Sequence, residues 1–232
     1  MQLTKNSQFS RIDRKQSISS IELQMNTTTI ITGDIIRSKR VKPIVWLPIL
    51  EQTLSKISSR KGDWEIYRGD SFQLEISPAQ VFEAFLYIRT AIKTVPLLDV
   101  RMAIGVGAKS YSGESILTSN GSAYTNSGEA FELLKKQTIT IKTSSETLNE
   151  ELNTTFALVA FIIDKWSANT ARVALAALDN PELNQKELAK KLNKDNGLLS
   201  RQLKKSGLDE IRNTISCCTK NLSKNLPNEP VG

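Results

Sequence analysis

Large apolar residues alternate with charged or polar residues along residues 64–76, on both sides of Gly69-Asp70. A period of two is typical of half-buried β-strands. Gly-Asp between two such runs favours a tight turn, because Gly accepts a positive φ and Asp tolerates one. The pattern therefore predicts a β-hairpin that carries the carboxylate of Asp70 at or beside its tip.

A second Gly-Asp pair lies in a β-branched run at residues 28–36, which predicts a first strand ending near Gly33-Asp34. Aspartates are common in turns for backbone reasons alone, so a single Gly-Asp pair says little about chemistry. Two aspartates at strand ends, Asp34 and Asp70, could converge on one hard cation such as Mg²⁺. The basic loop at residues 37–40 could meet phosphate oxygens, and a solvated turn is the alternative.

The remaining patterns complete the predicted order of elements. Helical spacing and turn signals predict helices over residues 44–57, 78–92, 123–136 and 208–222, strands at 100–107 and 138–142, and one long helix over 155–178. The resulting order, β-α-β-β-α-β with a trailing α-β, is that of a ferredoxin-like palm and its extension. We therefore expect an α+β fold followed by a small all-α domain.

Residues 183–207 contain the signals of two short helices joined by a tight turn. Asn184, with Glu187 three residues later, fits a capping box, and Asn193 suits a left-handed turn position. The pair resembles a bacterial helix-turn-helix, whose second helix enters the DNA major groove. An ordinary helical hairpin and a degenerate helix-turn-helix used for dimerisation are the alternatives. The expected DNA-contacting positions are Asn196, Ser200, Arg201, Lys204 and Lys205.

The positive charge is concentrated in the tail. The formal net charge is +7, and residues 165–232 carry 12 Lys or Arg against 7 Asp or Glu, whereas residues 26–164 carry 15 of each. A basic excess on one module indicates a nucleic-acid partner for that module. We therefore expect the tail to face double-stranded DNA.

Composition excludes several classes of site and compartment. The chain has no histidine, so His-based triads and His metal sites are excluded, and the adjacent Cys217-Cys218 pair suits neither a structural disulfide nor a zinc site. No apolar run approaches the roughly 20 residues of a membrane span, and the start lacks the apolar core of a signal peptide. We expect a cytoplasmic protein without a membrane partner.

Four segments together resemble the SatD family, whose N-terminal part is similar to the palm of class III nucleotidyl cyclases and GGDEF proteins. The segments are G-D-I-I-R-S at 33–38, Y-R-G-D-S-F-Q at 67–73, V-R-M-A-I-G-V-G at 100–107 and N-G-S-A-Y-T-N-S-G-E-A at 120–130. The resemblance implies Mg²⁺ or Mn²⁺ held by Asp34, the backbone of Ile35, and Asp70. It also implies a nucleoside triphosphate cradled by Ile36, Arg37, Ser38 and Gly69.

The chain departs from active cyclases at the positions that act on the nucleotide. Alignment on Gly121 places Thr125 and Glu129 where those enzymes have an Asn and an Arg that stabilise the transition state. The Lys that reads the purine in many of them corresponds to Trp64. The chain therefore keeps the metal-binding aspartates of the cyclases, but the residues that read the base and stabilise the transition state are not evident.

We predict a disordered leader at 1–25, a cyclase-like palm at 26–152, a helix-turn-helix domain with its long connecting helix at 153–225, and a frayed tail at 226–232. The expected function is that of a DNA-binding transcriptional regulator whose palm binds a metal-nucleotide, with a homodimer as one allowed state. Two alternatives stay open. One is a Mg²⁺-dependent nucleotidyl cyclase or polymerase, and the other is a catalytically inert dimerisation palm.

Overall fold

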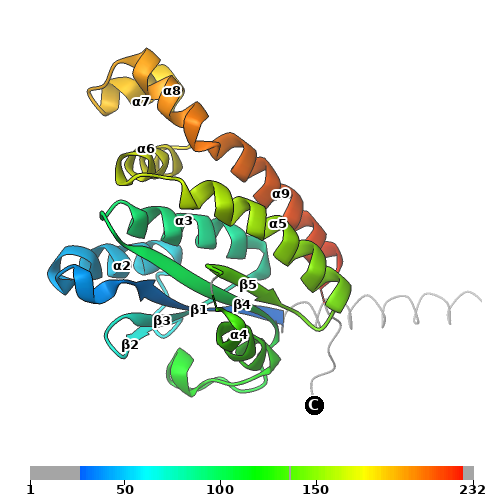
Figure 1. The fold of residues 1–232 in the computed structure, drawn as a ribbon. Helices are drawn as coiled ribbons and strands as arrows, with labels where there is room; N and C mark the ends of the chain where they lie inside the picture. The colour runs from blue at the N-terminus through cyan, green and yellow to red at the C-terminus, as the bar shows by residue number, and fades with distance from the viewer. Residues whose placement is uncertain (1–26, 136, 227–232) are drawn as a thin grey trace, which may run out of the picture.

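The described strands form one mixed sheet in the order β2-β3-β1-β4-β5 (Figure 1). The structure is a computed structural model that describes residues 27–135 and 137–226. The strands are β1 (Thr27–Ile36), β2 (Trp64–Tyr67), β3 (Ser71–Ile76), β4 (Asp99–Ala108) and β5 (Ile139–Lys142). β1 pairs antiparallel with β3 and β4, β2 antiparallel with β3, and β5 parallel with β4. The predicted hairpin is confirmed, since β2 and β3 pair across the Arg68–Asp70 turn.

The helices follow the predicted order with one exception. They are α2 (Pro43–Ile57), α3 (Val81–Lys93), α4 (Ser122–Leu133), α5 (Glu146–Asp164), α6 (Ala168–Asp179), α7 (Gln185–Lys191), α8 (Asn196–Ser206) and α9 (Leu208–Lys224), with short 3-10 turns η1 (Ser38–Arg40), η2 (Pro78–Gln80) and η3 (Ile116–Thr118). The α+β class is therefore confirmed. The predicted leader at 1–25, and the predicted tail beyond Leu226, lie outside the described residues.

The exception is residues 155–178, for which the prediction of one long helix is wrong. The chain forms α5 and α6 instead, with a break at residues 165–167. Ser167 starts α6 by accepting a hydrogen bond from the backbone N–H of Thr170, and the buried Trp166 donates from Nε1 to the carbonyl of Ser206 at 2.8 Å. A local cap and a docked indole therefore interrupt a continuous apolar pattern.

The two faces of the sheet are covered by different helices (Figure 1). Alternation along β1 sends Ile31 and Ile35 into the large core with α2 and α3, and sends Ile30 toward α4. Gly105 of β4 lets the backbone of α4 approach closely, because a Cβ there would lie 2.2 Å from the carbonyl oxygen of Ala123. The late glycines of this strand therefore serve helix packing.

The main core extends from the sheet to the C-terminal helices α5, α6 and α9. Phe156 of α5 packs against Phe82 and Phe85 of α3, with ring centroids 4.6 and 5.5 Å apart. Buried side chains of α6 and α9 belong to the same cluster. A second, small cluster of Val173, Leu188, Ala189 and Leu199 holds α7 and α8 against α6. None of the helices in the described residues has both the length and the apolar character of a membrane span.

Candidate functional site

Asp34 and Arg101 form the centre of the first candidate site. They are direct cross-strand partners in β1 and β4, and the guanidinium donates from Nε to Oδ1 at 2.6 Å and from Nη2 to Oδ2 at 2.7 Å. The ring of Phe131 in α4 lies 5.3 Å from the same guanidinium. Hydrogen bonding to Asp34 raises the pKa of Arg101, although partial burial alone would lower it. Both carboxylate oxygens of Asp34 are thus occupied by a fixed cation.

The prediction that Asp34 ends its strand is wrong, because β1 continues to Ile36. The extra residues place Asp34 opposite Arg101 within the ladder, where neighbouring strands hold both backbones. Sequence reasoning missed Arg101. The available signal was its position in V-R-M-A, where alternation places the arginine on the face opposite the buried Val100 and Met102.

Asp70 lies beside the end of β1. Its backbone carbonyl accepts the N–H of Ile35 at 3.0 Å, and its Oδ2 accepts the hydroxyl of Ser38 at 2.5 Å. The charge of Asp70 also acts on Arg101, whose pKa it helps to raise. The structure therefore brings Asp70 beside Asp34, Ile35 and Ser38, which lie more than 30 positions earlier in the sequence.

The other predicted cradle residues surround this cluster. Gly69 is exposed at the hairpin tip with a φ of 88°, and Arg37 is exposed in the left-handed region at 64°. Ile36 is half-buried and lines a cavity of about 480 Å³ that Trp166 also lines. Arg37, Lys39 and Arg40 form no ion pair with any described residue, so their positive charge is available to an anion.

The carboxylates do not offer a free pair of oxygens to a divalent cation in this arrangement. Arg101 occupies Asp34, and Ser38 occupies one oxygen of Asp70. Over residues 27–135 and 137–226, no three His, Cys, Asp or Glu side chains are grouped to hold a metal. Hard cations prefer several oxygen ligands, so Mg²⁺ or Mn²⁺ would fit only after Arg101 releases Asp34.

The positions that differ from active cyclases have structural partners. Glu129 forms an ion pair with Lys142 of β5, and the Trp64 indole donates to the carbonyl of Ser58 at 3.2 Å. Thr125 donates to the carbonyl of Gly121 at 3.4 Å. Local packing therefore accounts for each of these side chains.

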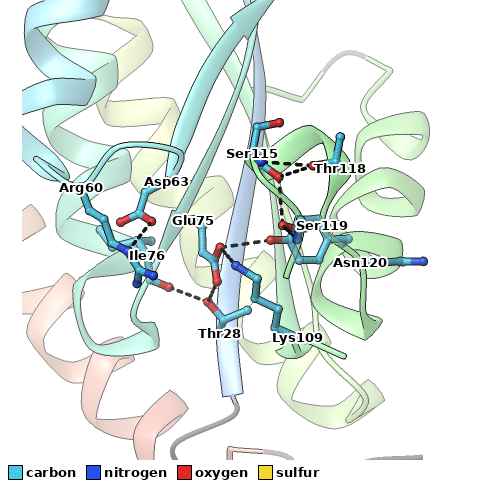
Figure 2. A network of polar contacts seen from close by, with 12 residues as sticks. Thr28, Arg60, Asp63, Glu75, Ile76, Lys109, Ser115, Thr118, Ser119 and Asn120 are labelled. Atoms are coloured by element: carbon cyan, nitrogen blue, oxygen red, sulfur yellow. Dashed lines mark hydrogen bonds and ion pairs between the residues drawn. The ribbon is translucent and has the colours of Figure 1, made fainter. Parts of the chain in front are cut away.

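A second polar network surrounds Glu75 near the N-terminal end of β1, away from Asp34 (Figure 2). Its carboxylate accepts hydrogen bonds from Lys109 at 2.5 Å, Thr28 at 3.1 Å and Tyr124 at 3.1 Å. Burial raises the pKa of Tyr124, and the charge of Glu75 adds to the effect. Sequence reasoning did not identify this cluster. Its groups satisfy one another and fasten the loop before α4 to the sheet.

The second candidate site is the pair α7 and α8. The predicted capping box is confirmed, because Asn184 accepts the N–H of Glu187 and Glu187 accepts the N–H of Asn184. Asn193 takes a φ of 49°, as expected for the turn. Asp195 then caps α8 by accepting the N–H of Leu198 at 2.8 Å. Two caps and a four-residue connection fix the angle between the helices.

The outward face of α8 is polar and basic. Asn196, Arg201, Lys204 and Lys205 are exposed and Ser200 is half-exposed, whereas Leu199 is fully buried against α6 and α7. In the part of the chain that the structure describes, none of the three basic side chains forms an ion pair. Their charges are therefore free to meet phosphates or base edges.

Comparison with known proteins gives one positive result. A family model described as the SatD family matches residues 28–222, a span that includes both candidate sites. No match was found among curated proteins or among solved structures.

Proposed function

The chain belongs to the SatD family, and within that family we propose that it is a DNA-binding transcriptional regulator. The observation that carries the proposal is the α7–α8 pair, in which a short capped turn presents a basic helix face to solvent. A helix-turn-helix docks its second helix in the major groove, with the first helix crossing the backbone. α8 is the candidate recognition helix in this assignment.

Residue roles follow from position along α8. Arg201 is exposed midway along the helix and is the candidate for reading a base edge, since arginine donates bidentately to guanine. Lys204 and Lys205 lie in the last turn and are candidates for phosphate contacts. Asn196 and Ser200 lie nearer the N-terminal end and complete the proposed DNA-contacting set.

We also propose that the sheet with α2 and α3 is a ferredoxin-like palm of the cyclase type. The support is the antiparallel order β4-β1-β3-β2, built from a β-α-β-β-α-β sequence of elements. α4 and β5 extend this unit at the β4 edge.

The palm is proposed to sense an anionic ligand, with a nucleoside triphosphate as the candidate. The support is the basic loop at residues 37–40, whose three basic side chains form no ion pair with any described residue, together with Asp70 beside it and the exposed Gly69 turn. Mg²⁺ or Mn²⁺ at Asp34 and Asp70 belongs to this proposal only if Arg101 leaves Asp34. A nucleotidyl cyclase or polymerase, and an inert dimerisation palm, are the competing functions, and assays for turnover of ATP or GTP by the purified protein separate the enzyme from the others.

The test of the regulator uses the full chain and fluorescence anisotropy on genomic fragments and random duplex at several salt concentrations. Arg201→Ala should weaken specific binding by about 1–3 kcal/mol and relax sequence preference, whereas Lys204→Ala should weaken binding to every duplex and flatten the salt dependence. Lys61→Ala, an exposed lysine in the loop before β2, is the matched control. A folded protein that binds no duplex at low salt would exclude the regulator.

A further inference from the structure

α5 presents two large apolar side chains to solvent. Leu158 is 66% exposed and Phe161 is 59% exposed, although the opposite face of the same helix is buried in the main core. Single exposed apolar residues are ordinary, but two at adjacent positions on one helix face form a patch. The helix itself lies beside α9 and β5 (Figure 1).

The two side chains belong to a longer stripe. Its members are exposed and follow one another at intervals of three and four residues, which places them along one line of the helix. They are Glu151, Thr154, Leu158, Phe161 and Lys165. The stripe therefore has an apolar centre, an acidic residue toward the N-terminus and a basic residue just after the C-terminus.

Neither end of the stripe is neutralised within the described part of the chain. The Lys165 ammonium lies 4.3 Å from the centroid of the Phe161 ring, and Glu151 accepts a hydrogen bond from the Asn221 amide at 3.0 Å. Neither charged residue forms an ion pair there. Glu151 and Lys165 could therefore each form an ion pair with a residue of another chain that contacts the apolar centre.

We propose that this stripe is the contact between two copies of the chain, with the two α5 helices antiparallel about a two-fold axis near Leu158. Glu151 and Lys165 each lie seven residues from Leu158, so each lies about 10.5 Å from the axis along the helix. Reversing the helix therefore places Lys165 of one copy opposite Glu151 of the other. A two-fold contact requires a self-complementary surface of this kind. Contact with an unrelated protein does not require one.

The assembly has a consequence for the tail. α5 leads directly through the break at residues 165–167 into α6, on which α7 and α8 are packed. A two-fold contact through α5 therefore relates two α8 helices by symmetry. The dimer is independent of the proposed DNA binding and is tested without DNA.

The first experiment is sedimentation velocity on the full chain. The wild type should form a dimer, and Leu158→Asp and Phe161→Asp should each give a folded monomer, because a buried carboxylate replaces an apolar contact. Ile44→Asp is the control, since Ile44 is 81% exposed on α2, a helix that lies apart from α5 in Figure 1. It should leave the dimer intact.

A charge swap tests the antiparallel arrangement. Lys165→Glu or Glu151→Lys should raise the dimer dissociation constant on the order of tenfold, because each substitution places like charges at two symmetric positions. The double variant should restore wild-type affinity. A double variant as weak as the single ones would overturn the proposed register.

Two other results would overturn the proposal itself. One is a wild type that stays monomeric at the highest soluble concentration, and the other is a dimer that persists in Leu158→Asp and Phe161→Asp. A wild-type monomer that dimerises only after removal of residues 2–24 would show that the N-terminal segment covers the stripe instead.

Discussion

At the scale of single residues, the pairing of Arg101 with Asp34 governs what the first candidate site can bind. The sequence alone suggested that the two carboxylates, Asp34 and Asp70, converge on one hard cation. Arg101 already supplies a positive charge to both, through bidentate bonds to Asp34 and at longer range to Asp70. A divalent cation would therefore compete with a fixed guanidinium.

This competition predicts the response to metal. Mn²⁺ should leave the melting temperature of the wild type nearly unchanged and should raise that of Arg101→Gln by a few degrees, because the variant has two uncompensated carboxylates. Thermal shift with and without Mn²⁺ measures this. Arg101→Gln combined with Asp34→Asn is the control and should not respond. Equal shifts in the wild type and Arg101→Gln would mean that Arg101 does not exclude the cation.

A second arginine connects the sheet to the C-terminal end of α5. Arg89 of α3 is fully buried and donates to Asp99 from Nε and Nη2, both at 3.0 Å, while Nη2 also contacts Asp164 at the end of α5. Lys93 approaches Asp99 at 3.0 Å. Burial alone would raise the pKa of Asp99, but bonding to Arg89 and the charges of Arg89 and Lys93 hold that pKa below its usual value.

Removal of this arginine should be costly. Arg89→Met should lower the free energy of unfolding by about 3–5 kcal/mol, because it leaves Asp99 buried with less compensation. Urea denaturation measures the change. Arg60→Met is the control, since Arg60 is exposed and lies 3.8 Å from Asp63; its effect should stay within about 1 kcal/mol.

The pH dependence gives an independent check on Arg89. A carboxyl whose folded pKa is lowered stabilises the protein above its unfolded pKa, about 3.9, and that contribution is lost as pH falls through the folded value. The stability gap between wild type and Arg89→Met should therefore be largest near neutral pH and narrow below about pH 4. A gap that stays constant down to pH 3 would assign the loss to packing.

At the scale of elements, side chains of α5 hydrogen-bond to the backbone along the β5 edge of the sheet. Asn153 accepts the N–H of Ile141 and donates to its carbonyl, both at 2.8 Å, while Asn149 makes the corresponding pair of bonds to Thr143. The two asparagines are one helical turn apart and take the place of a sixth strand. An edge satisfied in this way cannot pair with another chain.

Asn153→Ala should destabilise the protein by about 1–3 kcal/mol, because the N–H and carbonyl of Ile141 lose their partners. It should also increase self-association under mild heating, since an open strand edge is available. Chemical denaturation and light scattering measure the two effects. Glu150→Ala, an exposed neighbour on α5, is the control. A change below about 0.5 kcal/mol in Asn153→Ala would show that water replaces the asparagine at the edge.

At the scale of the whole molecule, the tail and the sheet share one core. The apolar face of α9, formed by Leu208, Ile211, Ile215, Cys218 and Leu222, belongs to the cluster that also contains α3 and β3. A fragment of residues 165–232 would expose this face to water. We therefore expect the two parts to depend on each other for stability.

The full chain should unfold in one cooperative transition, and the 165–232 fragment should show low helical content without a cooperative transition. Circular dichroism during thermal and urea unfolding measures both. Two separate transitions in the full chain, or a fragment that melts cooperatively, would show that the tail is an autonomous domain.

Local periodicity in the sequence was enough to predict most of the helices and strands of this protein. The β2–β3 hairpin, the helix α3 and the capping box of α7 each depend on residues within a few positions of one another. Alternation, helical spacing and cap chemistry were therefore sufficient to predict them. The α+β order of elements followed from the same signals. The family resemblance proposed from four short segments agrees with the match over residues 28–222.

The tertiary structure decided the features that depend on distant residues. Asp34 and Arg101 are 67 positions apart, and only the β1–β4 register brings them together. The break between α5 and α6 depends on Trp166 reaching Ser206, 40 positions away. A periodic pattern fixes which face of an element is buried, but it carries no information about which element covers that face. Partners of buried polar groups are therefore set by packing and strand register.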